Sequence, residues 1–97
     1  MLHLVFQSSF EIAILDRINS GDLIVFMGDS VLRALDYSIY AESFKSSLAN
    51  RYELYVLEDD IVIRGIAADR LVRGIQVIDY SGLVALTTEN KVIQSWF

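Results

Sequence analysis

The sequence predicts an α/β protein with three layers, α/β/α, built around a five-stranded and mainly parallel sheet. Short apolar segments of strand length alternate along the chain with segments in which apolar residues recur every three or four positions, as they do in a helix. The chain contains no proline, and it has no low-complexity tract and no internal repeat. The alternation therefore runs through residues 1–97 as a single domain.

Five apolar segments predict the strands. Leu23–Met27 is the clearest of them, because it is apolar on both faces, as a central strand of a parallel sheet should be. In chain order, the predicted strands are Leu2–Phe6, Leu23–Met27, Tyr52–Leu57, Ile75–Asp79 and Val92–Trp96.

Helical patterns fill the intervals between these strands. A capping box at Ser8–Glu11 predicts the start of a helix in which the apolar residues Phe10, Ile14 and Ile18 recur every four positions. We expect this helix to end at Gly21. A second helix is predicted from about Val31, with Val31, Leu35 and Ile39 on one face, and a short third helix contains Phe44 and Leu48. The last two predicted helices are Asp60–Arg64, which ends at Gly65, and Gly82–Asn90. Strands joined in order through helices imply a parallel sheet with helices on both faces and right-handed crossovers.

The composition indicates more apolar surface than one small domain needs. Hydrophobic residues make up 54% of the chain, against about 45–50% in soluble domains, so we expect some of them to face another chain. The longest apolar run, Leu23–Gly28, is far shorter than the roughly 20 residues that span a bilayer. The sequence does not open with a basic region followed by an apolar run and a cleavage site, and we expect a cytoplasmic protein that does not bind a membrane.

The charge argues against direct binding to nucleic acid. Eight basic residues stand against thirteen acidic ones, which gives a formal net charge of −5, and no cluster of Lys or Arg offsets this locally. Such a chain would be repelled by a phosphate backbone.

Polar residues follow the predicted strands at the edge where open α/β sheets bind ligands. They are Ser8, Asp29, Glu58 with Asp59 and Asp60, and Asp79. Carboxylates gathered at one edge could hold Mg²⁺, and Asp29, Asp59 and Asp79 would then serve a small Mg²⁺- or nucleotide-dependent enzyme or a receiver-like domain. The interpretation we favour is that each Asp caps the helix after it, because a carboxylate there accepts from free backbone N–H groups.

The remaining polar candidates have simpler structural explanations. His3 lies inside the first predicted strand with no cysteine to pair with, so we expect a packed or edge histidine. Gly28–Ser30 opens a helix after a strand but lacks the further glycines and the lysine of phosphate-binding loops, which favours a tight turn with a cap. We expect no catalytic residue, no metal ion and no cofactor.

Large aromatic residues are candidates for contacts between subunits. Trp96 and Phe97 close the sequence, where residues normally fray and a large side chain gains little. Packing against the sheet edge or against another subunit would remove that cost, and Trp often contributes strongly to interfaces. Tyr37, Tyr40 and Tyr80 are similar candidates, with core packing or a hydrogen-bonded rim as the alternative.

Five short segments stand out together, and they are Met1–Leu4, Gly28–Val31, Leu57–Gly65, Val77–Thr88 and Gln94–Phe97. In their order and spacing they resemble the TusB/DsrH family over essentially the whole chain. The resemblance implies the three-layer DsrEFH-like fold. Asp60 and Arg64, followed by Gly65, form one of the most specific matches, and we expect this pair to fix the turn after the third strand or to face a partner.

Members of this family look like one third of an assembly with two homologous subunits. The resemblance implies TusC- and TusD-like partners in a heterohexamer of two heterotrimers. That assembly takes persulfide sulfur from a TusA-like donor and passes it to a TusE-like acceptor, toward 2-thiolation of the wobble uridine of tRNA. The candidate contact residues are Tyr37, Tyr40, Asp60, Arg64, Tyr80, Trp96 and Phe97.

The chain contains no cysteine, although persulfide transfer requires a thiolate. The resemblance places the transferring cysteine on the TusD-type subunit. In the sulfur-oxidising branch of the family the DsrH-type subunit can have a cysteine in its first helix, whereas Glu11–Asn19 contains none and Ile14 stands near that place. This favours the tRNA-thiolation branch and a subunit that acts through assembly.

Three interpretations remain open at this point. The first is a non-catalytic subunit of a sulfur-relay complex. The second is the small Mg²⁺- or nucleotide-dependent protein that uses the acidic rim. The third is a self-associating module without a ligand.

Overall fold

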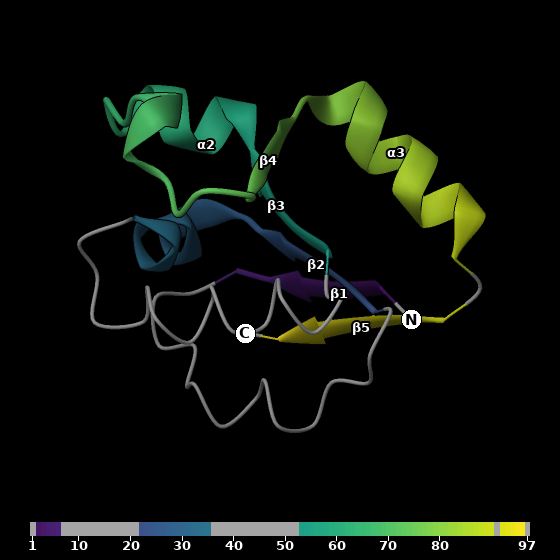
Figure 1. The fold of residues 1–97 in the computed structure, drawn as a ribbon. Helices are drawn as coiled ribbons and strands as arrows, with labels where there is room; N and C mark the ends of the chain where they lie inside the picture. The colour runs from purple at the N-terminus through teal and green to yellow at the C-terminus, as the bar shows by residue number, and fades with distance from the viewer. Residues whose placement is uncertain (1, 7–21, 36–52, 91, 97) are drawn as a thin grey trace.

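The computed structural model describes residues 2–6, 22–35, 53–90 and 92–96. In chain order its elements are β1 (Leu2–Val5), β2 (Leu23–Phe26), the 3-10 helix η2 (Gly28–Ala34), β3 (Glu53–Leu57), α2 (Glu58–Ile63), the 3-10 helix η3 (Ala68–Arg70), β4 (Gln76–Ile78), α3 (Tyr80–Glu89) and β5 (Ile93–Trp96). The strands form one sheet in the order β4-β3-β2-β1-β5, and every neighbouring pair is parallel (Figure 1). The predicted α/β class and its parallel sheet are confirmed.

β2 lies at the centre of the sheet because both of its faces are apolar. Ile24, Val25 and Phe26 are fully buried, and β2 pairs with β1 on one side and with β3 on the other. Burying a side chain such as Phe26 stabilises the fold by about 1.5–3 kcal/mol. The register aligns Val5, Phe26 and Val56, so β1, β2 and β3 come to a common level at their carboxyl ends.

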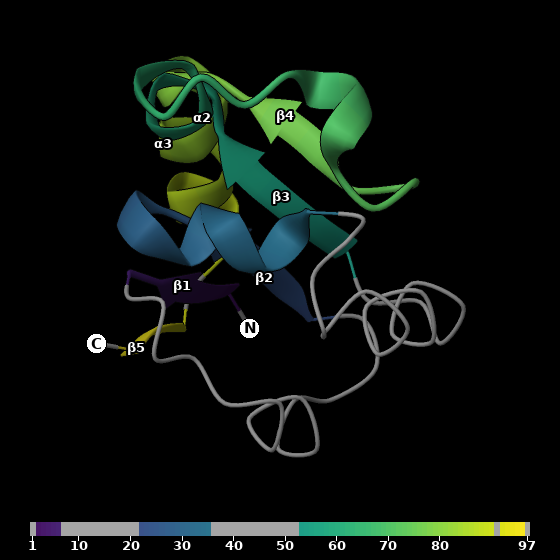
Figure 2. The same ribbon diagram turned by 90° about the vertical axis from the view of Figure 1, so that its left-hand side faces the viewer.

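Two apolar cores lie on opposite faces of the sheet and create the three layers. On one face, Ile24 and Val56 pack with residues of η2, α2 and the segment after α2. On the other face, Val25 and Leu57 pack with Leu83 of α3. Helices η2 and α2 therefore cover one face and α3 the other (Figures 1 and 2). This is the three-layer arrangement that the sequence predicts, and no helix in the described ranges is long and apolar enough to cross a membrane.

The segment after β2 differs most from the prediction. Its helix begins at Gly28 instead of at about Val31, is of the 3-10 type and ends at Ala34. Leu35 has extended backbone angles and forms an antiparallel bridge with Leu71, so the expected helical face shared by Val31 and Leu35 does not exist. Both side chains are buried nonetheless. The apolar spacing thus predicted burial correctly but not conformation, because an extended residue beside a short helix can fill the same space.

Smaller differences concern the ends of two helices. α2 begins at Glu58, two residues before its predicted start, and α3 begins at Tyr80 and not at Gly82. Other predictions lie outside the described residues, namely the Ser8–Glu11 box, the helix with Phe10, Ile14 and Ile18, the stop at Gly21, Ile39, and the helix with Phe44 and Leu48.

The turn after β2 packs against the end of β1 more closely than a side chain permits. Gly28 has a φ of 57°, and a Cβ atom placed on it would lie 2.8 Å from the carbonyl oxygen of Phe6. Gly65, after α2, has a similar φ of 68°, but a Cβ there would meet nothing within 4 Å. The two glycines share a backbone conformation and differ in the space around them.

We predict that Gly28→Ala destabilises the protein more than Gly65→Ala does. Both substitutions place a side chain in the left-handed region, at a cost of roughly 1–2 kcal/mol. Only Gly28→Ala adds a clash with a backbone carbonyl, which raises its total cost to roughly 2–5 kcal/mol. Urea unfolding of both variants measures the difference, and equal losses would show that the turn after β2 relaxes freely.

Candidate functional site

A hydrogen bond between a turn and a neighbouring helix joins the carboxyl ends of β2 and β3. Asp60, in the first turn of α2, accepts through Oδ2 from the backbone N–H of Gly28 at 2.8 Å. The N–H groups at the start of a helix have no partner within that helix. Because Gly28 is the first residue of η2, Asp60 caps η2 from another element.

Arg64 extends this contact into a network. One of its guanidinium nitrogens donates to Oδ1 of Asp29 at 2.6 Å, and the other donates to the backbone carbonyl of Asp60 at 3.0 Å and lies 3.7 Å from Oδ1 of Asp60. Arg64 follows the last residue of α2 and Asp29 is the second residue of η2. The network therefore ties the start of η2 to both ends of α2, and we name Asp29, Asp60 and Arg64 the rim network.

Solvent weakens the outer part of the rim network. The Asp29 side chain is 67% exposed, whereas those of Arg64 and Asp60 are 25% and 21% exposed. An exposed ion pair such as Arg64 with Asp29 contributes about 0–1 kcal/mol. The charge-assisted bond from the Gly28 N–H to the better buried Asp60 is worth more, on the order of 1.5–3 kcal/mol.

Ser30 completes the turn from the inside. Its side chain is completely buried, and its hydroxyl lies 2.7 Å from the carbonyl oxygens of Val5 and Met27 and accepts from the Met27 N–H at 3.0 Å. The hydroxyl has one proton, so it donates to one carbonyl at a time. Ser30 thus joins the end of β1 to the start of η2 and has no face open to a substrate, in agreement with its predicted role as a cap.

The prediction that each aspartate caps its own helix is correct for Asp79 and wrong for the others. Asp79 precedes α3 and accepts from the N–H of Gly82 at 2.8 Å. Asp29 binds Arg64, Asp60 caps η2, and α2 has no side-chain cap. Asp29 accepts from the Arg64 guanidinium and Asp60 from the Gly28 N–H, so each carboxylate bonds to a neighbouring element instead of its own helix.

The acidic rim does not gather into a metal site in the described part of the chain. No group of three or more His, Cys, Asp or Glu side chains there could hold a metal ion, so Asp29, Asp59 and Asp79 are not brought together. The Asp29 carboxylate is already neutralised by Arg64, and the Asp79 carboxylate accepts from a helix N-terminus.

A buried pair links β1 to the start of β2. Nε2 of His3 lies 3.0 Å from Oδ2 of Asp22, and the two residues are 3% and 7% exposed. β1 pairs on both sides, so His3 is the packed histidine of the prediction and not an edge one. Asp22 was missed, because nothing in the sequence around it points to His3.

A second polar contact lies on the other face of the sheet. The Tyr55 hydroxyl donates to Glu53 at 3.2 Å. Burial, together with the negative charge of Glu53, the hydrogen bond to it and the charge of Glu89, raises the pKa of Tyr55. The hydroxyl therefore stays protonated and acts as a donor in this contact.

The predicted contact residues are only partly placed. Tyr80 is 61% exposed at the start of α3, close in sequence to Val84, which is 56% exposed. Trp96 ends β5, where its backbone pairs with Val5. Asp60 and Arg64 lie in the rim network, and Tyr37, Tyr40 and Phe97 lie outside the described residues.

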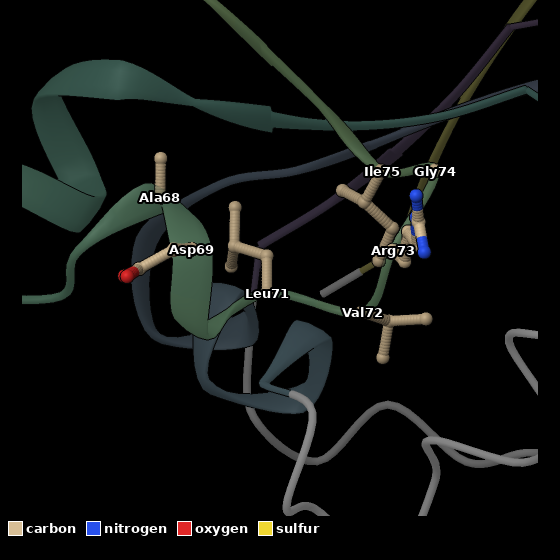
Figure 3. Close-up of a pocket in the computed structure, with 7 residues that line it drawn as sticks. All are labelled: Ala68, Asp69, Leu71, Val72, Arg73, Gly74 and Ile75. Carbon is tan, nitrogen blue, oxygen red and sulfur yellow. The ribbon is translucent and has the colours of Figure 1, made fainter.

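Two hollows flank the loop between α2 and β4. One, of about 470 Å³, lies between η2 and this loop and is lined by Leu32, Leu35, Arg64, Gly65, Ile66, Ala67 and Arg70. The other, of about 440 Å³, is lined by residues 68, 69 and 71–75, with Asp69 and Arg73 on opposite sides of it (Figure 3). Sequence patterns gave no sign of either hollow, since each joins residues without a periodic spacing.

We predict that Asp60→Ala lowers the free energy of unfolding by about 1.5–3 kcal/mol, because it leaves the Gly28 N–H without its acceptor. Asp59→Ala is the matched control, since Asp59 is exposed in the same helical turn and should change stability by no more than about 0.5 kcal/mol. Hydrogen exchange at the Gly28 amide should accelerate in the first variant only. Unchanged exchange in Asp60→Ala would refute the role given to this bond.

Comparison with solved structures shows the fold. The chain superimposes on the Methanobacterium thermoautotrophicum protein MTH1491, described as of unknown function, with a TM-score of 0.81, 14% identity and coverage of 98% of this chain and 96% of that one. It superimposes on the ychN protein of E. coli with a TM-score of 0.78, 15% identity and coverage of 98% and 97%. At such low identity these likenesses concern the fold alone.

Comparison of sequences is more specific. The chain is 29% identical over 99 residues to Protein TusB of Escherichia coli O1:K1 / APEC, covering 99% of this chain and all of that protein. It is 33% identical over 84 residues to Protein TusB of Yersinia enterocolitica serotype O:8 / biotype 1B, covering 87% and 84%. The family model described as DsrH like protein matches residues 6–93. The chain therefore belongs to the DsrH-like protein family.

Proposed function

We propose that this chain is a subunit of a sulfur-relay complex of the TusBCD type that supports 2-thiolation of the wobble uridine of tRNA. The observation that carries the proposal is the match along nearly the whole chain to proteins named Protein TusB. In this proposal the partners are homologous TusC- and TusD-like subunits, in a heterohexamer of two heterotrimers. Sulfur arrives from a TusA-like donor and leaves to a TusE-like acceptor.

The chemistry of the chain supports a role without its own sulfur transfer. Its 97 residues include no cysteine, and a persulfide needs a thiolate to form on. At the carboxyl edge of the sheet, the side chains of the rim network and of Ser30 are occupied by structural contacts. These contacts would let the edge offer a fixed surface to a reactive subunit.

Exposed apolar side chains support a role in assembly. Tyr80 and Val84 lie one helical turn apart on α3, so they share a face of that helix. Apart from Glu89, α3 has no charged residue, and charged residues are depleted at the centres of interfaces. We propose this face of α3 as a contact with a homologous subunit, together with Tyr37, Tyr40, Trp96 and Phe97. We propose that Asp60 and Arg64 act on assembly by positioning α2.

The acidic-rim alternative finds no support in the described residues. A magnesium-dependent protein would bring its carboxylates together with free oxygen ligands. Here Asp29, after β2, is paired with Arg64, and Asp79, after β4, caps α3.

The test is reconstitution with purified subunits. We expect this chain to co-purify with TusC- and TusD-like chains, and formation of 2-thiouridine in tRNA to depend on its presence. Mass spectrometry should find no covalently bound sulfur on this chain during turnover. Failure to co-purify, or a sulfur adduct on this chain in the absence of its partners, would refute the proposal.

We predict that Tyr80→Ala weakens the complex at least about tenfold, because an aromatic side chain central to an interface often contributes that much. The isolated chain should lose no more than about 0.5 kcal/mol of stability, since Tyr80 is exposed. Trp96→Ala and Tyr40→Ala are expected to weaken the complex likewise, with Arg73→Ala as the exposed control. Complex formation at wild-type strength by all three aromatic variants would contradict the assignment of the contact surface.

A further inference from the structure

The outer face of α2 is acidic at its start and apolar at its end. Val62 and Ile63 are 66% and 77% exposed, and Ile63 is the most exposed large hydrophobic side chain in the described ranges. Glu58 and Asp59 stand four residues before them, and residues four apart share a helix face. The opposite face of α2 carries the buried Ile61, so this exposed face is not needed for the fold.

The hollow beside η2 begins where α2 ends. Its lining includes Leu32, Ile66 and two arginines, Arg64 and Arg70, and no carboxylate. Arg64 is committed to the rim network, whereas Arg70 makes no ion pair with the part of the chain that the structure describes. The hollow thus offers aliphatic walls and one available positive charge, and we call it the Arg70 groove.

The outer face of α2 and the Arg70 groove have complementary chemistry. Glu58 and Asp59 are exposed and, among the described residues, form no ion pair. The Arg70 groove has the opposite charge and aliphatic walls. In a twofold symmetric contact, each copy presents the same patch, so a patch that contains both an acidic-apolar ridge and a basic-apolar groove complements itself.

We propose that this surface binds a second copy of the chain. Val62 and Ile63 of the two copies meet near a twofold axis, and the acidic start of each α2 faces Arg70 of the partner subunit. This contact involves no residue of the α3 face and does not depend on the proposed sulfur-relay role.

The strength expected of this contact is modest. Each copy contributes two strongly exposed aliphatic residues, and contacts that bury less than about 1,200 Å² are typically weak or transient. The net charge of −5 makes two copies repel each other at long range, so the paired charges select the orientation while the aliphatic residues supply the affinity. We expect a dissociation constant in the range of roughly 10 μM to 1 mM.

Sedimentation equilibrium of the full chain from about 10 μM to 1 mM tests the proposal. Wild type should show a monomer–dimer equilibrium, and both Ile63→Asp and Arg70→Glu should raise its dissociation constant at least about tenfold. Val92→Asp is the control for Ile63→Asp, because it places the same charge at an exposed aliphatic position just before β5, the edge strand farthest from β4. Arg73→Glu is the control for Arg70→Glu, because Arg73 lines the other hollow (Figure 3).

A mixing experiment tests the twofold arrangement itself. Arg70→Glu alone and the double variant Glu58→Lys with Asp59→Lys should each fail to dimerise, since like charges would then face each other at both contacts. Mixed together they should form a heterodimer of near wild-type strength, because one contact is native and the other has both charges exchanged. Circular dichroism of each variant verifies that it is folded.

Three outcomes would overturn the proposal. The first is a wild-type chain that remains monomeric at 1 mM, and the second is dimerisation that survives both Ile63→Asp and Arg70→Glu. The third is a monomeric chain whose capture of TusC- or TusD-like subunits is abolished by Ile63→Asp, which would assign the surface to a different subunit. If the double variant does not fold, the comparison of Ile63→Asp with Val92→Asp still decides the question.

Discussion

The hydrogen bond from the Gly28 N–H to Asp60 is the contact on which the carboxyl edge of the sheet depends. Gly28 lies so close to the Phe6 carbonyl that the turn after β2 has little freedom, and Asp60 fixes the orientation of its first N–H. Arg64 then closes the arrangement by reaching Asp29 on that same turn. Two successive βα connections are thereby held as one unit, although they are far apart in sequence.

Whether a contact could be predicted from the sequence depends on how many residues separate its two partners along the chain. The strands were predictable because burial on both faces leaves a continuous apolar run, as in β2. The capping role of Asp79 was predictable because its partner, Gly82, is three residues away. Asp29 and Asp60 find their partners 35 and 32 residues away, and no local rule selects among distant donors. Asp29, Asp60 and Asp79 of the acidic rim therefore make structural contacts and are not free ligands.

The same reasoning explains why the hollows and the His3 pair were missed. Asp22 meets His3 across neighbouring strands, through a register that the sequence does not specify. The Arg70 groove joins the end of η2 to a loop about thirty residues later, and its lining includes Leu35, which leaves the helix and bridges to Leu71. The failed helix prediction and the unforeseen groove thus both involve Leu35.

α2 has two faces, and this division explains how one short helix can both stabilise the fold and present an exposed apolar surface. Its inner face, with Asp60 and Ile61, is fixed to the turn after β2 and to the core. Its outer face, with Val62 and Ile63, is held at a set position by those contacts while remaining exposed. A surface fixed in advance loses little conformational freedom when a partner binds, so more of the contact energy remains available for association. In this view Asp60 and Arg64 favour the proposed contact between two copies of the chain by holding α2 in place.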